Sequence, residues 1–555
     1  MRTFYKLVIL VICLLTNKPS IAQWNYIGGA EYDFTSDPGF SDEGRKVVMD
    51  NAGGVYTISD HRSNINPSGI VTNLSYNYVI LRRYDISGNV IAETKINVGL
   101  LQENGLNNFS SFGLKLSGGA LYFGYTVHDA ANGFDVVIAK YTTSLTSSWV
   151  YRWQKATSNE KGIDFAVSGS TVYALVESNL NGVVSQAILK ANAASTVTVP
   201  FYNILNLKVT SIGVDSNLNV ILGGYKFNGT ANEVKLEKLS PTATQLWLVT
   251  YNAGSISGND RINKIEVTTD GSIYITGTSF NSLSGNQDFL IARYSSNGAR
   301  AWIRVVNRGV DDSGSLISAA TDHKILWVAG TSATNSLVFY RYDGRTGTLT
   351  GSAVAAPNIS GGAVLINRYE LSEMKMTNLS RNCYLVGSLI GKTAGDSLSA
   401  SFALKITNRL SVTVENGYYI DGSFSNSNAG VSIDFNETTK QVSILKNVFG
   451  DFAGHQSEAI SIENYGVTSA FKTSLDAEEV RAITTYPNPF KNELHVSGLL
   501  VDSKIEIMDI AGRMVLTSIA VDRNHTINTE GLTSGIYLLR SVNEAGVIST
   551  NRIVK

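Results

Sequence analysis

The sequence predicts an all-β protein: an eight-bladed β-propeller over residues 23–474, followed by a small Ig-like β-sandwich over residues 485–555. Three observations lead to this prediction. The chain consists largely of short runs in which apolar and polar residues alternate, which is typical of strands with one buried face. Turns of the Asp-Gly and Asn-Gly kind separate these runs. A unit of four runs then recurs about every fifty residues, which is typical of propeller blades.

One copy, between residues 261 and 306, shows the unit most clearly. A turn at Asp270-Gly271 joins its first two alternating runs, and a turn at Asn297-Gly298 joins the last two. A polar segment, residues 280–287, lies between the second and third runs. Because such turns favour hairpins, the copy is predicted to form one four-stranded antiparallel sheet.

Two marker positions identify the copies independently. In the second run the marker is usually aromatic and recurs at spacings of 48–66 residues, at Tyr56, Tyr122, Tyr173, Ile221, Tyr274, Trp327, Tyr384 and Ser443. In the third run the marker is basic in seven of eight copies, at Arg83, Lys140, Lys190, Lys238, Arg293, Arg341 and Lys405, with Glu463 in the eighth. Both markers indicate eight blades. Seven blades is the alternative, because the longest spacings would accommodate a merged copy.

Each copy has two apolar faces, and stacking around a ring buries both. We interpret the aromatic marker as packing between blades. We interpret the basic marker as a surface residue whose stem covers apolar neighbours while its charge reaches water. Residues 24–29, from Trp24 to Gly29, resemble a fourth run but precede the first complete copy. They are therefore predicted to pair with the last copy and close the ring.

The N-terminus predicts a secretory signal peptide over residues 1–22. A short basic segment precedes an apolar run, and small residues lead to a cleavage site between Ala22 and Gln23. Removal of this peptide leaves Cys383 as the only cysteine, which excludes an intrachain disulfide. No later stretch has the roughly eighteen consecutive apolar residues that a transmembrane span requires.

The C-terminal region carries four ordered motifs: Tyr486-Pro487-Asn488-Pro489, Asp509 followed by Gly512-Arg513, Gly535-Ile536-Tyr537, and the terminal Lys555. Together they resemble the type A C-terminal sorting domain of proteins exported by the type IX secretion system of Gram-negative bacteria. The resemblance covers residues 481–555. It implies that the partners are the type IX machinery and its cleaving and attaching enzyme. It also implies cleavage in the linker 475–484, with the propeller then released or anchored to surface lipopolysaccharide.

Composition and motifs argue against several functional classes. The 45 basic and 46 acidic residues give a formal charge of −1, which does not favour nucleic acid as a partner. Metalloprotease, serine-hydrolase and phosphate-loop motifs are missing from the sequence, and no two of the six histidines have metal-ligand spacing. We therefore expect no catalytic, cofactor-binding or metal-binding residue. Asp215-Ser216-Asn217-Leu218-Asn219 has a calcium-like spacing, but it stands where other copies turn and no distant Glu completes it.

We expect a secreted or cell-surface propeller that binds a glycan or protein ligand without catalysis. Polar loops on a rigid ring suit recognition, and the candidates are residues 60–77, 129–133 and 280–287. The alternative is an extracellular polysaccharide hydrolase or lyase with carboxylates near the ring axis. Its acid or base would be a residue that only one copy possesses. Such residues are His61, Asp129, Asp311 and Asp312.

One further pattern concerns modification. Asp396-Ser397-Leu398 resembles the O-glycosylation pattern of bacteria that have this secretion system. It falls in a predicted loop of the seventh copy, which makes Ser397 a candidate glycosylation site.

Overall fold

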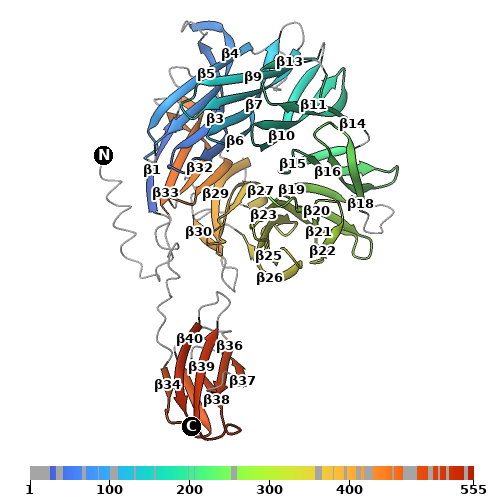
Figure 1. Ribbon diagram of the computed structural model, residues 1–555. Helices are drawn as coiled ribbons and strands as arrows, with labels where there is room; N and C mark the ends of the chain where they lie inside the picture. Colours follow the sequence, from blue (N-terminus) through green and yellow to red (C-terminus); the bar gives the residue numbers. More distant parts are fainter. Residues whose placement is uncertain are drawn as a thin grey trace, which may run out of the picture. The chain divides into compact units, whose positions relative to one another are not determined.

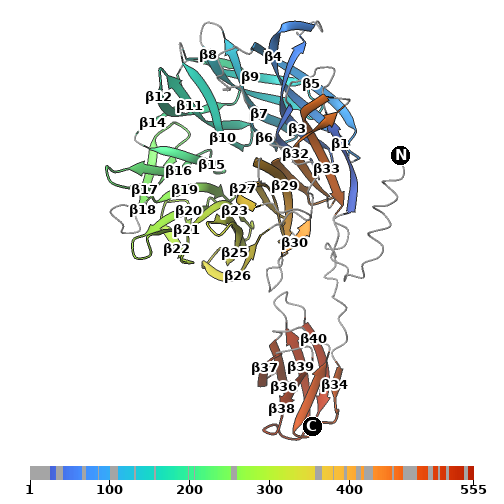
Figure 2. The ribbon, with the colours of Figure 1, turned by 180° about the vertical axis from the view of Figure 1, so that it is seen from behind.

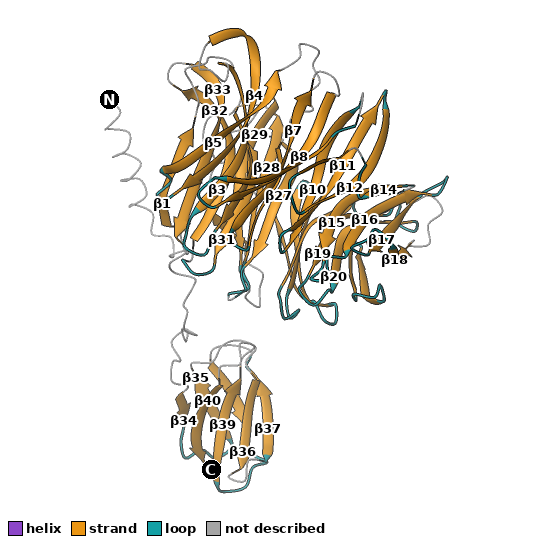
Figure 3. Cartoon of the chain, turned by 45° about the horizontal axis from the view of Figure 1, so that its top comes forward, coloured by secondary structure: helices purple, strands orange, loops and turns teal. Residues whose placement is uncertain are grey.

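The structure is a computed structural model. It describes residues 25–32, 42–65, 71–85, 87–100, 111–129, 133–155, 158–197, 199–205, 207–251, 259–356, 365–378, 380–392, 397–407, 414–417, 429–439, 441–452, 455–466, 484–497, 504–509, 513–520, 524–542 and 548–555. All regular elements in these ranges are strands, which confirms the all-β class (Figure 3). Two compact units are present, Met1–Thr468 (unit 1) and Ser469–Lys555 (unit 2). The predicted signal peptide, the cleavage site at Ala22 and Gln23, residues 475–483 of the linker and Gly512 lie outside the described residues.

Unit 1 contains eight sheets in its described part, numbered here in chain order. Sheet 1 consists of β2 (Asp42–Met49), β3 (Val55–Ile65), β4 (Val71–Tyr84) and β5 (Val90–Leu100), and sheet 2 consists of β6 (Ser111–Ser117), β7 (Ala120–Asp129), β8 (Gly133–Thr142), β9 (Ser147–Trp153) and β13 (Ser195–Val197). Sheet 3 consists of β10 (Asn159–Ser168), β11 (Thr171–Leu180), β12 (Val183–Ala191) and β14 (Tyr202–Ile204), and sheet 4 consists of β15 (Lys208–Val214), β16 (Val220–Phe227), β17 (Asn232–Leu239) and β18 (Gln245–Tyr251).

Sheets 5 to 8 continue the same antiparallel pattern. Sheet 5 consists of β19 (Arg261–Val267), β20 (Ile273–Asn281), β21 (Asn286–Tyr294) and β22 (Arg300–Val306), and sheet 6 consists of β23 (Asp312–Ala319), β24 (Leu326–Ser332), β25 (Ser336–Asp343) and β26 (Thr348–Ala355). Sheet 7 consists of β27 (Leu365–Met376), β28 (Cys383–Lys392), β29 (Ser397–Ile406) and β30 (Val414–Gly417), and sheet 8 consists of β31 (Ala429–Asn436), β32 (Gln441–Phe452), β33 (His455–Gly466) and β1 (Asn25–Tyr32).

The sheets follow one another around a propeller-like ring (Figures 1 and 2). The first strand of each sheet contacts the first strand of the next, and β2 contacts β31, so sheet 1 lies against sheet 8. β1 pairs antiparallel with β33, with Gly29 opposite Glu463 and Ala30 opposite Ile462. The N-terminal strand therefore completes the last sheet, as predicted from residues 24–29.

Sheets 2 and 3 depart from the simple repeat. Between β12 and β14 the chain forms β13, which pairs in parallel with β9, Ser195 lying opposite Tyr151. Sheet 2 thereby gains a fifth strand, and sheet 3 has only the three-residue β14 at its edge. The added strand covers an edge that would otherwise expose unpaired backbone groups.

The core of the ring is a series of apolar clusters that neighbouring sheets share. Leu81 of sheet 1 clusters with Leu121 of sheet 2, and Leu445 of sheet 8 clusters with Val47 of sheet 1. Because each sheet buries its faces only against its neighbours, the stability of one sheet depends on the next.

The two sequence markers lie directly opposite each other on adjacent strands. The pairs are Tyr56–Arg83, Tyr122–Lys140, Tyr173–Lys190, Tyr274–Arg293, Trp327–Arg341 and Tyr384–Lys405. In five of these pairs the cation lies 5.5 to 5.9 Å from the ring centroid, within cation–π range. The aromatic markers are buried between sheets, as predicted.

For three basic markers, Lys238, Arg341 and Lys405, the predicted surface position is wrong, because they are at most 5% exposed. A basic side chain is tolerated in a buried position where acceptor groups pair with it or accept its hydrogen bonds. Lys238 Nζ lies 2.8 Å from Asp215 Oδ2 and donates to Ser296 O of the next sheet at 3.0 Å. The basic marker therefore also joins neighbouring sheets.

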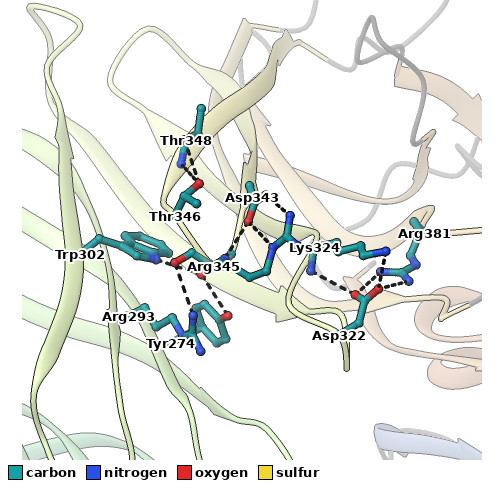
Figure 4. A network of polar contacts seen from close by, with 11 residues as sticks. Tyr274, Arg293, Trp302, Asp322, Lys324, Asp343, Arg345, Thr346, Thr348 and Arg381 are labelled. Carbon is teal, nitrogen blue, oxygen red and sulfur yellow. Dashed lines mark hydrogen bonds and ion pairs between the residues drawn. The ribbon is translucent and has the colours of Figure 1, made fainter. Parts of the chain in front are cut away.

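Figure 4 shows such a junction, in which side chains of sheet 5 donate to the β25–β26 turn of sheet 6. Trp302 Nε1 donates to Gly344 O at 2.9 Å, and Tyr274 OH donates to the same oxygen at 3.2 Å. On the other side of sheet 6, Asp322 pairs with Arg381 of sheet 7 at 2.7 Å. The turns thus bind consecutive sheets together through side chains.

Unit 2 contains two sheets in its described residues. Their strands are β34 (Thr484–Tyr486), β35 (Glu493–Ser497) and β38 (Asn524–Asn528) in one, and β37 (Met514–Ile519), β36 (Lys504–Asp509), β39 (Ile536–Val542) and β40 (Ile548–Val554) in the other. One apolar cluster contains Leu494 and Ile527 from the first sheet and Ile507 and Leu539 from the second. The two sheets therefore share one core.

Candidate functional site

Charged side chains gather where the first strands of the sheets meet. Two positions on each first strand share a face: the residue opposite the second-run marker and the residue two positions before it. Eight of these residues are charged, and we call them the axial cluster: Lys46, Lys115, Asp164, Lys264, Glu266, Glu373, Lys375 and Asp434. They come from β2, β6, β10, β19, β27 and β31. Residues far apart in sequence thus form one group around the ring axis.

A β-bulge precedes these positions on every first strand. The register shifts between Gly44 and Lys46, between Phe112 and Leu114, and between Ile262 and Lys264, and the other five sheets repeat the irregularity. Bulges bend a strand and re-aim its side chains. The bulge therefore contributes to how these side chains are presented to the axis.

The four carboxylates of the axial cluster each accept a backbone N–H from the next sheet. The donor–acceptor pairs are Ile212 N to Asp164 Oδ2 (3.0 Å), Ala319 N to Glu266 Oε2 (3.0 Å), Ile433 N to Glu373 Oε2 (3.2 Å) and Met49 N to Asp434 Oδ2 (2.8 Å). The last pair connects sheet 8 to sheet 1. The carboxylates are therefore committed to holding sheets together.

Three of the four lysines are ion-paired within the cluster. Lys46 Nζ lies 2.8 Å from Glu373, Lys264 Nζ lies 3.4 Å from Asp164, and Lys375 Nζ lies 3.8 Å from Asp434; Lys115 Nζ, by contrast, has no hydrogen bond or ion pair within the described part of the chain. Lys115 is only partly buried, so its ammonium group is the one cation here that is left to pair with something else.

The electrostatics of the cluster shift two pKa values toward neutrality. Repulsion from Lys375, together with burial and with Lys46, lowers the pKa of Lys115 to about 8. Burial raises the pKa of Glu266 to about 7, although Ala319 N–H and the lysines oppose the shift. Strongly shifted groups that lie together often mark a functional site. The raised pKa of Glu266 weakens its negative charge near neutral pH, so the carboxylates balance the four lysines less completely.

The sequence-predicted acid and base candidates do not belong to the axial cluster. His61 is buried in β3 with its ring 6.1 Å from that of Tyr78. Asp311 accepts the N–H of Gln287 at 2.7 Å, and buried Asp312 pairs with Arg308 at 3.4 Å. The side chain of Asp129 lies outside the described residues.

Two predicted recognition loops are instead largely strand. β3 continues to Ile65 and β4 begins at Val71, so Asp60 and Asn77 are buried strand residues. Likewise β20 ends at Asn281 and β21 begins at Asn286. Cross-strand pairing extends the hairpins beyond the last apolar residue, because backbone hydrogen bonds do not require apolar side chains.

Two other positions from the sequence take part in strand and turn structure. Asp215 Oδ1 accepts the N–H groups of Asn217 and Asn219 at 2.9 Å each, which makes it a turn-capping residue. Ser397 begins β29 opposite Lys392, and its side chain lies outside the described residues. In the described ranges no group of three or more His, Cys, Asp or Glu residues is arranged to hold a metal ion.

Sequence reasoning missed the axial cluster, although a signal was present. The marker residue in the second run is aromatic in six of eight copies, whereas the first-run residue that pairs with it is charged in four copies (Lys115, Glu266, Lys375 and Asp434) and uncharged in the others. Variation at one position of an otherwise regular repeat would have identified the face on which the copies differ.

The C-terminal motif residues hold the ends of unit 2 together. Asn488 Oδ1 accepts the N–H of Val554 at 2.9 Å. Lys555 exchanges two backbone hydrogen bonds with Gly535 and donates from Nζ to Thr529 O at 2.6 Å. The terminal residue is thus part of the fold.

Two more motif residues close turns of unit 2, and Tyr486 is half-exposed. Asp509 Oδ1 accepts the N–H of Arg513 at 3.0 Å, and Tyr537 OH donates to Thr533 O at 2.6 Å. The hydrogen-bonded motif residues therefore serve the local structure of unit 2.

Residues 484–555 match the family model of the secretion system C-terminal sorting domain. Unit 2 is a type IX sorting domain. The protein is therefore exported by the type IX system to the cell surface or the extracellular space, and its sorting domain interacts with the secretion machinery. In the part of the chain that is described, no helix has the length and apolarity needed to cross a membrane.

Solved structures resemble the chain at low identity. PorZ, a surface component of the type IX system of Porphyromonas gingivalis, is 12% identical with a TM-score of 0.34, over 90% of this chain and 69% of PorZ. The Dos1 propeller is 10% identical with a TM-score of 0.43, over 81% of this chain and 97% of that structure. The propeller domain of the Trilobed protease of Pyrococcus furiosus is 8% identical with a TM-score of 0.35, over 66% and 97%. Among curated proteins, no sequence matches this chain.

Proposed function

We propose that this protein is an exported, non-catalytic β-propeller that binds a glycan or protein ligand at the axial cluster. In this proposal the eight sheets are eight blades and the sorting domain is an Ig-like β-sandwich. The count of eight, rather than seven, is supported by the eight sheets with equivalent first strands. The sandwich is supported by the two sheets of unit 2 that share one apolar core.

The observation that supports the binding function is that Lys115 has no ion pair or hydrogen bond within the described part of the chain. The other charges of the axial cluster are paired with one another or with backbone N–H groups, whereas Lys115 is not. Side chains held on strands of a rigid ring are preorganised, which favours binding because little entropy is lost on association. A single available cation among fixed charges is suited to recognising a ligand.

An alternative function is a polysaccharide hydrolase or lyase, and one observation favours it. The pKa of Lys115, about 8, and the pKa of Glu266, about 7, are close to the values that general acid–base catalysis uses. Against this alternative, Glu266 Oε2 already accepts the N–H of Ala319.

One experiment separates the two functions. The purified exported chain is screened on a glycan array and, in parallel, for turnover of the same polysaccharides. We expect retention of ligands without product formation. Product that disappears in Lys115→Ala and Glu266→Gln, with the fold intact by circular dichroism, would establish the enzyme instead.

We propose further that a signal peptide over residues 1–22 directs the chain through the inner membrane. Cleavage in the linker 475–484 would then leave the propeller released or attached to lipopolysaccharide. The observation in support is that unit 2 is a compact unit with an apolar core of its own.

A further inference from the structure

In the axial cluster, the charge that is left available to a ligand is positive. Each carboxylate has an oxygen that accepts a backbone N–H from the neighbouring sheet, and Glu373 also accepts from Ser432 Oγ. A ligand cation would have to compete with these bonds and with the lysines. An anion would instead meet Lys115, which no group of the described chain pairs with.

Two neighbouring lysines can strengthen such a contact. The side chains of Lys264 and Lys375 are 41% and 35% exposed. Their ion pairs, at 3.4 and 3.8 Å, are longer than the 2.8 Å pair of Lys46 with Glu373. Both ammonium groups therefore combine a long ion pair with a partly exposed side chain, which leaves each of them accessible to a ligand anion.

We propose that the axial cluster binds the acidic group of a glycan, a carboxylate or sulfate, through Lys115 with support from Lys264 and Lys375. This inference rests on the proposed binding function and names the ligand class. A bound anion would form charge-assisted hydrogen bonds with the ammonium groups and relieve the repulsion between them.

The proposal predicts a pH dependence with a definite sign. Binding requires Lys115 to be protonated, and a neutral Glu266 avoids repelling the anion. With pKa values of about 8 for Lys115 and about 7 for Glu266, affinity falls as the pH rises from 6 to 9. The other charged groups facing Lys115 are Lys46, Lys264, Lys375 and Glu373, of which Glu373 has a pKa lowered to about 2 and stays ionised.

The test uses matched acidic and neutral ligands. Binding of tetragalacturonate, its fully methyl-esterified form, a sulfated chondroitin tetrasaccharide and inorganic sulfate is measured by calorimetry on the purified chain at pH 6 and pH 9. We expect at least one acidic glycan to bind, at least tenfold more tightly at pH 6 than at pH 9. The methyl ester and inorganic sulfate should bind at least tenfold more weakly than that glycan.

Variants assign the contact to the cluster. Lys115→Met keeps most of the aliphatic stem and should lose at least tenfold in affinity at pH 6, whereas Lys115→Arg should retain binding, with less loss at pH 9. Lys324→Met, at a side chain that is 64% exposed and outside the cluster, is the matched control and should bind as the wild type does. Glu266→Gln should keep the affinity at pH 6 and weaken the pH dependence.

Several outcomes would overturn the inference. Equal binding by Lys115→Met, equal binding of the methyl ester, or binding of inorganic sulfate alone would each exclude an acidic-glycan site at Lys115. A neutral glycan or a protein bound independently of Lys115 would refute the inference while leaving a binding function in place. Turnover of a bound glycan would refute the non-catalytic function and leave the ligand class intact.

Discussion

Trp327 offers the most direct test of how neighbouring sheets stabilise each other. Its ring is fully buried between sheets 6 and 7 and clusters with Leu385 and Leu404. Its Nε1 donates to Arg381 O at 2.9 Å, and Arg341 lies 5.9 Å from its ring centroid. Replacement by Ala removes the ring and leaves a cavity, which costs about 3–5 kcal/mol for a buried aromatic residue.

The graded variant Trp327→Phe separates packing from hydrogen bonding. It keeps most of the apolar contact but leaves Arg381 O without its donor, which costs about 1–3 kcal/mol. Urea unfolding followed by circular dichroism should therefore rank the midpoints as wild type, then Trp327→Phe, then Trp327→Ala. The control is Trp247→Ala, because Trp247 is only half-buried on β18 and should lower the midpoint less.

The result that would refute this reasoning is specific. If Trp327→Ala unfolds at the same urea concentration as Trp247→Ala, then packing between sheets 6 and 7 does not limit the stability of the ring.

The remaining predictions concern pH, export and modification. Burial raises the pKa of Glu266 from 4.5 to about 7, so between these pH values the folded chain keeps a proton that the unfolded chain releases. The free energy of unfolding should therefore fall as the pH rises from about 4.5 through 7. The urea midpoint of Glu266→Gln should not show this decline, whereas the urea midpoint of the control Glu370→Gln, at an exposed side chain, should show it. Deletion of residues 481–555 should leave the protein in the periplasm, as seen by cell fractionation, and normal export of the truncated chain would contradict the sorting function. Mass spectrometry of the exported chain should find a glycan on Ser397 that Ser397→Ala removes; an unchanged mass would exclude this site.

The strands and hairpins of the ring could be predicted from the sequence, because the signals that specify them lie close together in the chain. Alternation, Asp270-Gly271 and similar turns specify hairpins within about fifty residues, and the marker pair Tyr274–Arg293 is set by hairpin register. The closing strand also followed from the pattern, since residues 24–29 had no partner in the first copy and β1 indeed pairs with β33. The sorting motifs are likewise local in sequence and readable as such.

Only the tertiary structure decided which charges meet. Lys115 and Lys375 are separated by more than four repeats of the chain, yet repulsion between them is the largest influence on the pKa of Lys115. Their proximity depends on the contacts between the first strands of successive sheets, which a single repeat does not encode. For the same reason the burial of Lys238 escaped prediction, because one of its hydrogen-bond partners, Ser296 O, belongs to the next sheet. Local sequence specifies how each sheet forms, whereas electrostatics and burial are sums over neighbours that only the assembled ring brings together.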